Sequence, residues 1–432
     1  MTEHDAPSLA EIASCVGGYD PNALPVAQAR EFIARLVPRV QAIEMLALRS
    51  ALGRVLARDI VSAIDVPAND NSAMDGYALR GAELAADAAT SFQVAGSTGF
   101  AGQALRRDSV GAGQCARIMT GAVMPAGLDT VVPQEFVKLS GDRIEVPPGI
   151  VRSGENRRLA GEDLARGETA LAGGRVLRPA DLGLIASLGV CEVAVRRRLR
   201  VAFFSTGNEL RSLGEPLDPG CVYDSNRYTL WGMLQRLGVE VLDLGVVRDD
   251  PAALEAAFRA AADAADAVIT SGGVSVGEAD HTKAVMAALG DVLFWRIAMR
   301  PGRPMAIGRI GGAHGAAILF GLPGNPVAVM VTFYALVRDA LLAMSGAAPE
   351  AIPTLRAASV TAIRKKPGRT EYQRGVVTRA DSGGWQVRVS GAQGSGILRS
   401  MSEANGLVVL RHEQGDVAAG ELVDVLPFDG VV

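Results

Sequence analysis

Three glycine-containing stretches of this chain each follow an apolar run and carry side chains that suit a bound anion or metal ion. They are "STGNEL" at 205–210, "TSGGVSVGEAD" at 270–280 and "GLPGNP" at 321–326. A glycine turn that opens a helix exposes backbone N–H groups, which bind phosphate. The middle stretch is neither a dinucleotide-binding motif nor a P-loop, and it carries Glu278 and Asp280 but no lysine. An ordinary capped turn explains any one stretch, whereas three together predict a site for a phosphate-bearing ligand.

Acidic residues in and near these stretches predict a divalent cation. A phosphate ester held by backbone N–H groups needs no lysine when carboxylates hold a Mg²⁺ ion that screens its charge. Glu209, Asp249 and Asp280 could supply hard oxygen ligands of this kind. For Asp249, which stands in "RDDP", the alternative is a role as N-cap of the next helix.

Three arginines lie close together in "FWRIAMRPGRP". The guanidinium fork of arginine matches phosphate and other oxyanions with two parallel hydrogen bonds. A solvated charged surface is the alternative, but the apolar residues between the arginines indicate a partly buried strand end. Arg296, Arg300 and Arg303 are therefore predicted to form an anion site.

A second polar cluster is predicted earlier in the chain. The stretch "DVPANDNSAMDGYAL" at 65–79 is too polar and too long for an ordinary connection. Its Asp75 stands before a glycine, and Thr120 in "RIMTGAVMP" and Asp163 in "RLAGEDLARGE" also lie in glycine-bounded turns. A plain turn would explain the Asp-Gly pair alone.

The elements that position the first three stretches form an α/β domain. The segments "LRVAFFST", "VEVLDLGVV", "DAVITSGG", "PMAIGRI" and "AAILFGLPG" are continuous apolar strands, and helical patterns lie between them. This alternation predicts a central, doubly wound, mostly parallel sheet covered on both faces. Ligands of such sheets bind at the carboxyl ends of the strands, where the three stretches lie. The segment "NPVAVMVTFYALVRDALLAMSG" is expected to be a closing helix.

The remaining sequence predicts an α/β plus β multidomain chain. The first residues lack a sustained period, helical spacing continues through "LALRSALGRVLARDIV", and short strands then alternate with glycine and proline turns. The expected parts are a flexible tail (1–24), a helical and extended linking domain (25–61 with 167–198), an inserted small β domain (62–166), the α/β domain (199–347) and a C-terminal β-barrel domain (348–432).

Composition excludes several classes of partner and site. The chain has 432 residues, which is too many for one core, and a net charge of −4, which argues against nucleic acid. Its four cysteines form no CxxC pair, and four histidines leave little for a histidine-based metal site. The N-terminus is acidic, and no stretch is expected to be apolar enough to span a membrane. These features predict a cytoplasmic protein.

Taken together, "DNSAMDGYA", "GEDL", "STGNEL", "YDSNR", "TSGGVSVGEAD", "RPGRP" and "GLPGNPV" resemble the molybdopterin molybdenumtransferase family, to which the E domain of gephyrin also belongs. The match runs in order from about residue 25 to 428. The resemblance implies a molybdopterin-binding α/β domain and the last step of molybdenum cofactor biosynthesis. In that step, molybdate is inserted into adenylylated molybdopterin and AMP is released. A Mg²⁺ cofactor is implied as well.

The resemblance also implies roles for individual residues. The catalytic set matches the family's functional polar residues: Asp75, Thr120, Asp163, Glu209, Asp249 and Asp280, the last three also as metal ligands. The substrate-binding set comprises Ser205, Thr206, Gly207, Ser271, Gly272, Gly273, Ser275, Gly277, Pro323, Gly324, Asn325 and Pro326. The molybdate-binding set is Arg296, Arg300 and Arg303, of which the first two stand where lysine is common in the family.

The implied assembly is a homodimer with a shared active site, which is also the commonest way to bring two distant polar clusters together. The molybdopterin adenylyltransferase and recipient molybdoenzymes are further implied partners. Alternatives remain for the α/β domain alone, which would fit that adenylyltransferase or the related domain of a pyridine-nucleotide pyrophosphatase or amidase. The flanking β domains argue against both. A scaffold role like that of gephyrin is a third possibility, for which the sequence lacks a fused adenylyltransferase domain or a long linker.

Overall fold

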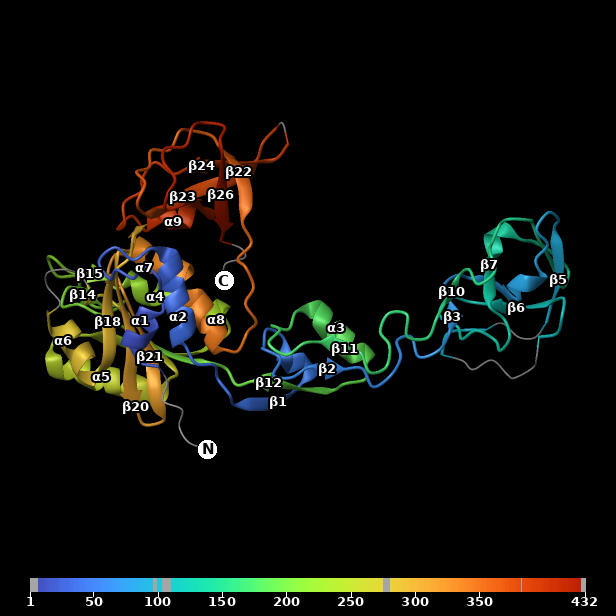
Figure 1. Cartoon of the computed structure of the whole chain (residues 1–432), viewed down its shortest axis with the longest axis horizontal. Helices are drawn as coiled ribbons and strands as arrows, with labels where there is room; N and C mark the ends of the chain where they lie inside the picture. Colours follow the sequence, from blue (N-terminus) through green and yellow to red (C-terminus); the bar gives the residue numbers. More distant parts are fainter. Residues whose placement is uncertain (1–6, 96–98, 103–109, 275–279, 382, 429–432) are drawn as a thin grey trace. The chain divides into compact units, whose positions relative to one another are not determined.

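The structure is a computed structural model that describes residues 7–95, 99–102, 110–274, 280–381 and 383–428. The chain divides into two compact units (Figure 1). The first unit comprises Met1–Glu44, Gly53–Ala57 and Ala194–Val432, and the second comprises Met45–Leu52 and Arg58–Val193. Each unit has its own hydrophobic core.

A six-stranded sheet forms the centre of the first unit, in the order β16-β13-β17-β21-β20-β18. Four strands are parallel: β13 (Arg200–Thr206), β16 (Glu240–Val247), β17 (Ala267–Ser271) and β21 (Gly315–Leu322). Antiparallel strands β20 (Pro304–Gly312) and β18 (Gly290–Arg296) complete one side. The prediction of a mostly parallel central sheet is confirmed.

Helices cover both faces of this sheet (Figure 1). On β13, Val201 and Phe203 pack into one buried cluster, whereas Ala202 and Phe204 pack into another on the opposite face. This alternation explains the continuous apolar strand in the sequence, because a strand buried on both faces has no solvent side. The covering helices are α2 (Val26–Leu36), α4 (Ser225–Arg236) and α7 (Pro326–Thr332) on the first face, and α5 (Pro251–Ala264) and α6 (Asp280–Leu289) on the second.

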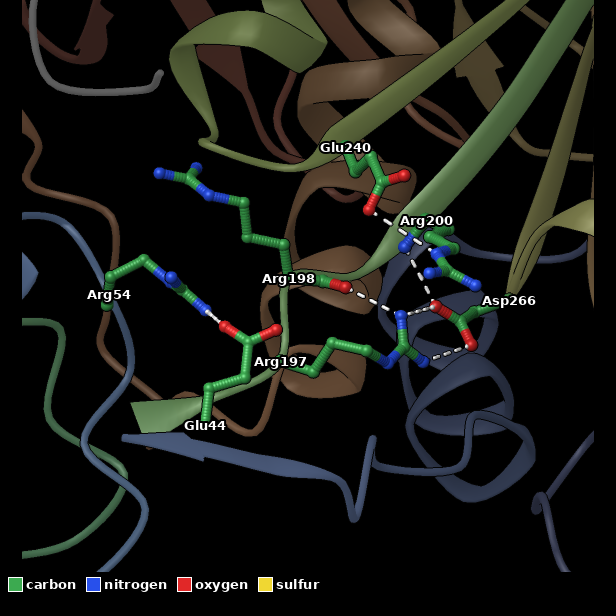
Figure 2. Close-up of polar contacts among 7 residues, drawn as sticks. All are labelled: Glu44, Arg54, Arg197, Arg198, Arg200, Glu240 and Asp266. Carbon is green, nitrogen blue, oxygen red and sulfur yellow. Dashed lines mark hydrogen bonds and ion pairs between the residues drawn. The ribbon is translucent and has the colours of Figure 1, made fainter. Parts of the chain in front are cut away.

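The beginning of β13 is held by ion pairs (Figure 2). Arg197 binds Asp266 with both guanidinium nitrogens, at 3.1 and 2.8 Å, and Asp266 also accepts from the Arg200 backbone N–H at 2.8 Å. Nearby, Arg54 donates to Glu44 at 2.7 Å. These contacts fix the start of β13 relative to β17, because Asp266 immediately precedes that strand.

The expected flexible tail over 1–24 is wrong for residues 9–24. They form helix α1 (Leu9–Ser14) and a segment whose apolar side chains are buried in the core of the first unit, with Leu9 and Leu24 1% and 0% exposed. Trp295 donates its indole N–H to the Tyr19 hydroxyl at 2.8 Å. Four widely spaced apolar residues anchor this segment, and no run of them is long enough to show a helical period.

The second expected helix in the linking segment is also wrong. Residues Ile43–Ala47 form strand β1, which pairs with β12 (Glu192–Arg196), and only Leu48–Ala51 is helical, as the short 3₁₀ turn η1. Strand β2 (Ile60–Val61) pairs with β11 (Thr169–Leu171) beyond it. Side chains along β1 alternate in exposure, and this period of two was concealed by the leucines that follow.

The second unit contains a six-stranded sheet in the order β7-β4-β6-β5-β9-β8. Its strands are β4 (Gly76–Leu79), β5 (Thr90–Val94), β6 (Gln114–Ile118), β7 (Thr130–Pro133), β8 (Lys138–Ser140) and β9 (Arg143–Val146). The short pair β3 (Asn71–Ser72) and β10 (Arg157–Arg158), the 3₁₀ turns η2 (Gly81–Glu83) and η3 (Gln134–Phe136), and helix α3 (Pro179–Ser187) complete the unit. The small β domain expected from the alternation of strands and turns is thus present.

The C-terminal residues form a closed barrel within the first unit. Its strands are β22 (Leu355–Ser359), β23 (Thr370–Arg379), β24 (Trp385–Val389), β25 (Gly406–Leu410) and β26 (Leu422–Pro427), with helix α9 (Arg399–Glu403). Strand β25 pairs with both β26 and β23, which closes the ring. The two-residue strand β19 (Met299–Arg300) adds to β23 in parallel and thereby joins the barrel to the α/β domain. The predicted β-barrel is confirmed.

One helix, Pro326–Met344, is long and apolar enough to span a membrane by length and composition, contrary to expectation. It comprises α7, the π-helical turn η4 (Phe333–Val337) and α8 (Arg338–Met344). Within the protein, 72% of its apolar window is buried, and Val329 and Phe333 are completely enclosed. Its apolar surface packs in the core of the first unit.

Gly76 is expected to be indispensable for the small β domain. A Cβ atom at this position would lie 2.0 Å from the Val132 carbonyl oxygen on the neighbouring strand. Gly76→Ala should therefore lower the free energy of unfolding of this unit by about 2 kcal/mol or more, as measured by thermal unfolding. Gly183→Ala is the matched control, since open space surrounds Gly183 within α3 and alanine favours helix. Equal stability of the Gly76→Ala protein and the wild type would contradict the close strand approach.

Candidate functional site

The three glycine-containing stretches begin on neighbouring strands at one edge of the central sheet. Ser205 of β13 is opposite Ser271 of β17, and Ser271 is opposite Leu322 of β21. Because these strands are parallel, their carboxyl ends lie together. The predicted placement of the stretches is confirmed.

A buried asparagine ties two of these loops together. The Asn226 amide nitrogen donates to the Ser271 hydroxyl at 2.8 Å and to the Gly324 carbonyl at 2.7 Å, and the residue is 8% exposed. Asp224 caps the same helix, α4, by accepting from the Arg227 N–H. Asn226 belongs to the "YDSNR" stretch, but its individual role could not be predicted from the sequence. An asparagine just after a helix start resembles an ordinary capping residue.

Glycine is required at two points of this edge. A Cβ atom on Gly272, whose φ is +97°, would lie 2.5 Å from the Thr206 carbonyl oxygen. Gly207 has a φ of +154°, which strains residues with a side chain, and the nearest atoms to its Cβ position are those of the flexible Glu209 carboxylate. The loops therefore approach each other closely, with main chain and carboxylate at the surface where a ligand would lie.

Asp249 faces the first loop. The Thr206 hydroxyl donates to Asp249 Oδ1 at 2.5 Å, and the Asp249 N–H donates to Asn208 Oδ1 at 3.3 Å. The alternative role for Asp249 is excluded, because the N-cap of α5 is Asp250, whose carboxylate accepts from the Ala253 N–H. The side chains of Thr206 and Asp249 thus meet at one corner of the sheet edge, beside the loop that carries Glu209.

The structure does not place the other predicted residues of these loops at a common surface. Ser275 and Gly277 lie outside the described residues, and Asp280 is described only as the first residue of α6. Ser205 is completely buried in β13, so its side chain is not at the surface of the edge. Among the described residues, no group of three acidic, histidine or cysteine side chains is placed to hold a metal. Glu209 and Asp249 offer two of the hard oxygen donors that Mg²⁺ prefers.

An arginine-lined pocket of about 550 Å³ adjoins this edge. Arg300 and Arg303 line it together with Pro323, Gly324 and Asn325. Arg296 is not among the lining residues; it lies at the end of β18, where its carbonyl accepts from the Leu24 N–H. The arginine stretch therefore contributes two of its three predicted members.

The opposite wall of the pocket comes from the barrel and was missed by sequence reasoning. Arg369, Gln393, Gly394 and Ser395 line it. The Arg369 guanidinium pairs at 2.8 Å with Glu371, which is 2% exposed. Because that carboxylate is already shared with Arg369, the pocket keeps a surplus of positive charge from Arg300 and Arg303. The one signal in the sequence for this wall is the basic stretch "KKPGRTEYQRG", which contains Arg369.

The second unit brings two of its predicted polar residues together. Asp75 Oδ1 accepts from both the N–H and the hydroxyl of Thr120, each at 2.7 Å. These bonds, the backbone one first, lower the pKa of Asp75 and keep it ionised. Asp163 is exposed in the turn that follows β10, where its N–H donates to the Val66 carbonyl, and no described contact joins it to Asp75.

Three family models match consecutive parts of this chain. They are the MoeA N-terminal region (domain I and II) over residues 24–189, the probable molybdopterin binding domain over 202–343, and the MoeA C-terminal region (domain IV) over 356–428. The crystal structure of the molybdopterin biosynthesis moeA protein from Pyrococcus horikoshii OT3 superposes with a TM-score of 0.79 at 28% identity, covering 94% of this chain and 100% of that one. The fold and its order of domains are therefore shared along the whole chain.

Sequence comparison with curated proteins gives the same family as the family models and the solved structure. The molybdopterin molybdenumtransferase of Haemophilus influenzae is 42% identical over 94% of this chain and 99% of its own length. The molybdopterin molybdenumtransferase of Nostoc sp. is 36% identical, with 91% of each chain covered. On these matches, the chain belongs to the molybdopterin molybdenumtransferase family.

Proposed function

We propose that this chain inserts molybdenum from molybdate into adenylylated molybdopterin and releases AMP. The names of its relatives support the transferase activity. The observation that carries the proposal is the position of the 321–326 loop. Its Gly324 carbonyl is bound by Asn226 at the sheet edge, and the same residue lines the arginine pocket. A ligand at the glycine turns would thus have its end beside a cationic pocket.

The site suits the two parts of this reaction. The pyrophosphate lies on the glycine turns, where exposed N–H groups bind its oxygens. Glu209, Asp249 and Asp280 would hold a Mg²⁺ ion, and the ion would screen the pyrophosphate charge. Arg300, Arg303 and Arg369 hold molybdate, because guanidinium groups pair with oxyanions in two-bond geometry.

The proposed reaction consists of pyrophosphate cleavage and molybdenum insertion. Water attacks the pyrophosphate, one phosphorus–oxygen bond breaks, and AMP leaves while the pterin keeps its own phosphate. Molybdate exchanges two of its oxygens for the two dithiolene sulfurs, and these oxygens leave as water with protons from the thiols and solvent. The chain orients both ligands, and the Asp249 carboxylate is held at the sheet edge by the Thr206 hydroxyl.

Molybdate-dependent release of AMP tests this proposal. Purified protein is mixed with adenylylated molybdopterin and Mg²⁺, with and without molybdate, and AMP is quantified by chromatography. The expected result is one AMP per pterin only when molybdate is present. Adenylylation of molybdopterin with ATP, and no AMP release, would instead assign the α/β domain to the adenylyltransferase reaction.

We further propose a cytoplasmic homodimer in which Asp75 and Thr120 of one chain act with the Glu209–Asp280 edge of the other. Its four free cysteines support a reducing location. When inactive Asp75→Ala and Asp280→Ala chains exchange subunits at random, about half of the dimers are mixed, each with one intact site. About a quarter of the wild-type AMP release should return. Verified subunit exchange without any recovery would contradict a shared site.

The adenylyltransferase that supplies the substrate and the molybdoenzymes that receive the product are proposed as transient partners. Both exchanges would pass the labile pterin directly between proteins.

A further inference from the structure

Arg374, on β23, is a buried arginine whose described guanidinium hydrogen bonds all go to neutral oxygens. It is 1% exposed. Its Nε donates to the Ser400 hydroxyl at 3.0 Å, and its Nη2 donates to the carbonyls of Ala392 and Gly394, each at 3.0 Å. Burial, and secondly the nearby charge of Arg300, lower the pKa of this group. A buried cation bonded to neutral groups is costly, which raises the question of what it does.

The carbonyls that Arg374 binds belong to the barrel wall of the arginine pocket. Gln393, between them, accepts from the Arg374 N–H at 3.0 Å and donates to the Arg374 carbonyl at 3.0 Å. The next residues, Gly394 and Ser395, line the pocket. Ser395 in turn accepts from the Val327 N–H at 3.0 Å.

This wall has no apolar anchor of its own at its centre. Ala392, Gly394 and Gly396 are exposed, and two of the three are glycines, which do not restrain the backbone. The main chain of this wall is held by the Arg374 guanidinium at one end and by the Val327 contact at the other, while the Gln393 side chain bonds to the Arg374 main chain and to Ser390. Both carbonyls point back toward Arg374, so they are turned away from an anion that enters the pocket.

We propose that Arg374 is a positioning residue for the oxyanion pocket: its two-carbonyl fork holds residues 392–394 in the conformation that admits molybdate. This inference rests on the proposed function, in which the pocket holds molybdate. Without the fork, the Ala392 carbonyl loses its described donor and is free to turn into the pocket, where it would repel an oxyanion, whereas the Gly394 carbonyl keeps only the Ile397 N–H at 3.3 Å. The role is distinct from that of Arg300 and Arg303, since Arg374 is enclosed behind the wall.

Molybdate titration by calorimetry and the molybdate dependence of AMP release test this role. Arg374→Met and Arg374→Lys are each expected to raise the molybdate dissociation constant about tenfold, while half-saturation by adenylylated molybdopterin changes less than about twofold. Lysine keeps the charge, but its single nitrogen cannot replace both Nη2, which binds the two carbonyls, and Nε, which binds Ser400, so it should not rescue. Hydrogen exchange at residues 391–397 should quicken in both variants.

Arg379→Met is the matched control. Arg379 lies on the same strand, but it is exposed and stacks on Trp385 with 4.3 Å from its guanidinium carbon to the ring centroid. Its replacement should leave molybdate binding unchanged. If the Arg374 variants do not fold, Ser400→Ala carries the test, because it removes one acceptor of the buried guanidinium and should weaken molybdate binding about threefold.

Three results would overturn the inference: wild-type affinity in a folded Arg374→Met protein, full rescue by lysine, or unchanged affinity in Ser400→Ala where that variant carries the test. Full rescue by lysine would show that Arg374 affects molybdate affinity only through its positive charge. Absence of molybdate binding by the wild-type protein would instead refute the proposed function of the pocket. The two failures are therefore distinguishable.

Discussion

Replacement of Arg300 and Arg303 together by glutamine is expected to raise the molybdate concentration for half-maximal AMP release about a hundredfold. Both arginines line the pocket, and each charge-assisted hydrogen bond to an oxyanion contributes about 1.5–3 kcal/mol. The loss of about 3 kcal/mol corresponds to the hundredfold change. Half-saturation by adenylylated molybdopterin should rise less than about threefold, because the pyrophosphate is proposed to bind at the glycine turns. Initial-rate measurements with each substrate varied in turn give both constants.

Arg296→Gln is the control for this pair, since Arg296 comes from the same stretch but does not line the pocket. It should leave both constants unchanged. Equal weakening for molybdate and for the pterin in the double variant would show that Arg300 and Arg303 act only as a general positive field.

The second large effect is expected at Asn226. Asn226→Ala removes both hydrogen bonds that join Ser271 and Gly324 and leaves the buried Ser271 hydroxyl without this donor, which costs about 1–3 kcal/mol. The two loops would also lose their register at the sheet edge. The rate of AMP release should fall by a factor of about ten to a hundred, because small displacements of positioning groups have large kinetic effects.

Thermal unfolding and single-turnover AMP release measure the two consequences of Asn226→Ala. The control is Gln235→Ala, which removes an exposed amide from the same helix and should change neither. A stable, fully active Asn226→Ala protein would mean that the loops keep their positions without this amide.

The central sheet could be predicted from the sequence because a strand buried on both faces appears as a continuous run of apolar residues. Strand β17 is buried at every position, and its five residues "AVITS" contain no charge. The parallel order then places the loop after each strand at one edge, so Thr206 and Ser271 could be located before the structure was known.

The barrel wall of the pocket could not be predicted in the same way. Arg369 reaches the pocket through the two-residue pairing of β19 with β23, and so short a pairing has no periodic pattern. The N-terminal segment was misread for a related reason. Helix α1 has six residues, of which only Leu9 and Ile12 are buried, so its packing is invisible in a window of ordinary length.

Acidic residues were the least predictable part of the site. The sequence could not decide between Asp249 and Asp250 as the cap of α5, because both precede Pro251 within the same turn. The structure assigns the cap to Asp250 and turns Asp249 toward Thr206. Whether Asp249 or Asp250 becomes the N-cap of α5 depends on the path of the chain after β16, and that path is set by tertiary packing.

The most direct test of the account is a single-turnover reaction in which molybdenum transfer and AMP release are measured together. Protein, adenylylated molybdopterin and Mg²⁺ are mixed with molybdate; the pterin product is isolated and its molybdenum is counted against the AMP formed. The account predicts one molybdenum atom on the pterin for each AMP released. Neither AMP nor the molybdenum-containing pterin should form when molybdate or adenylylated molybdopterin is omitted. AMP release that is equally fast without molybdate, or a product without molybdenum, would contradict it.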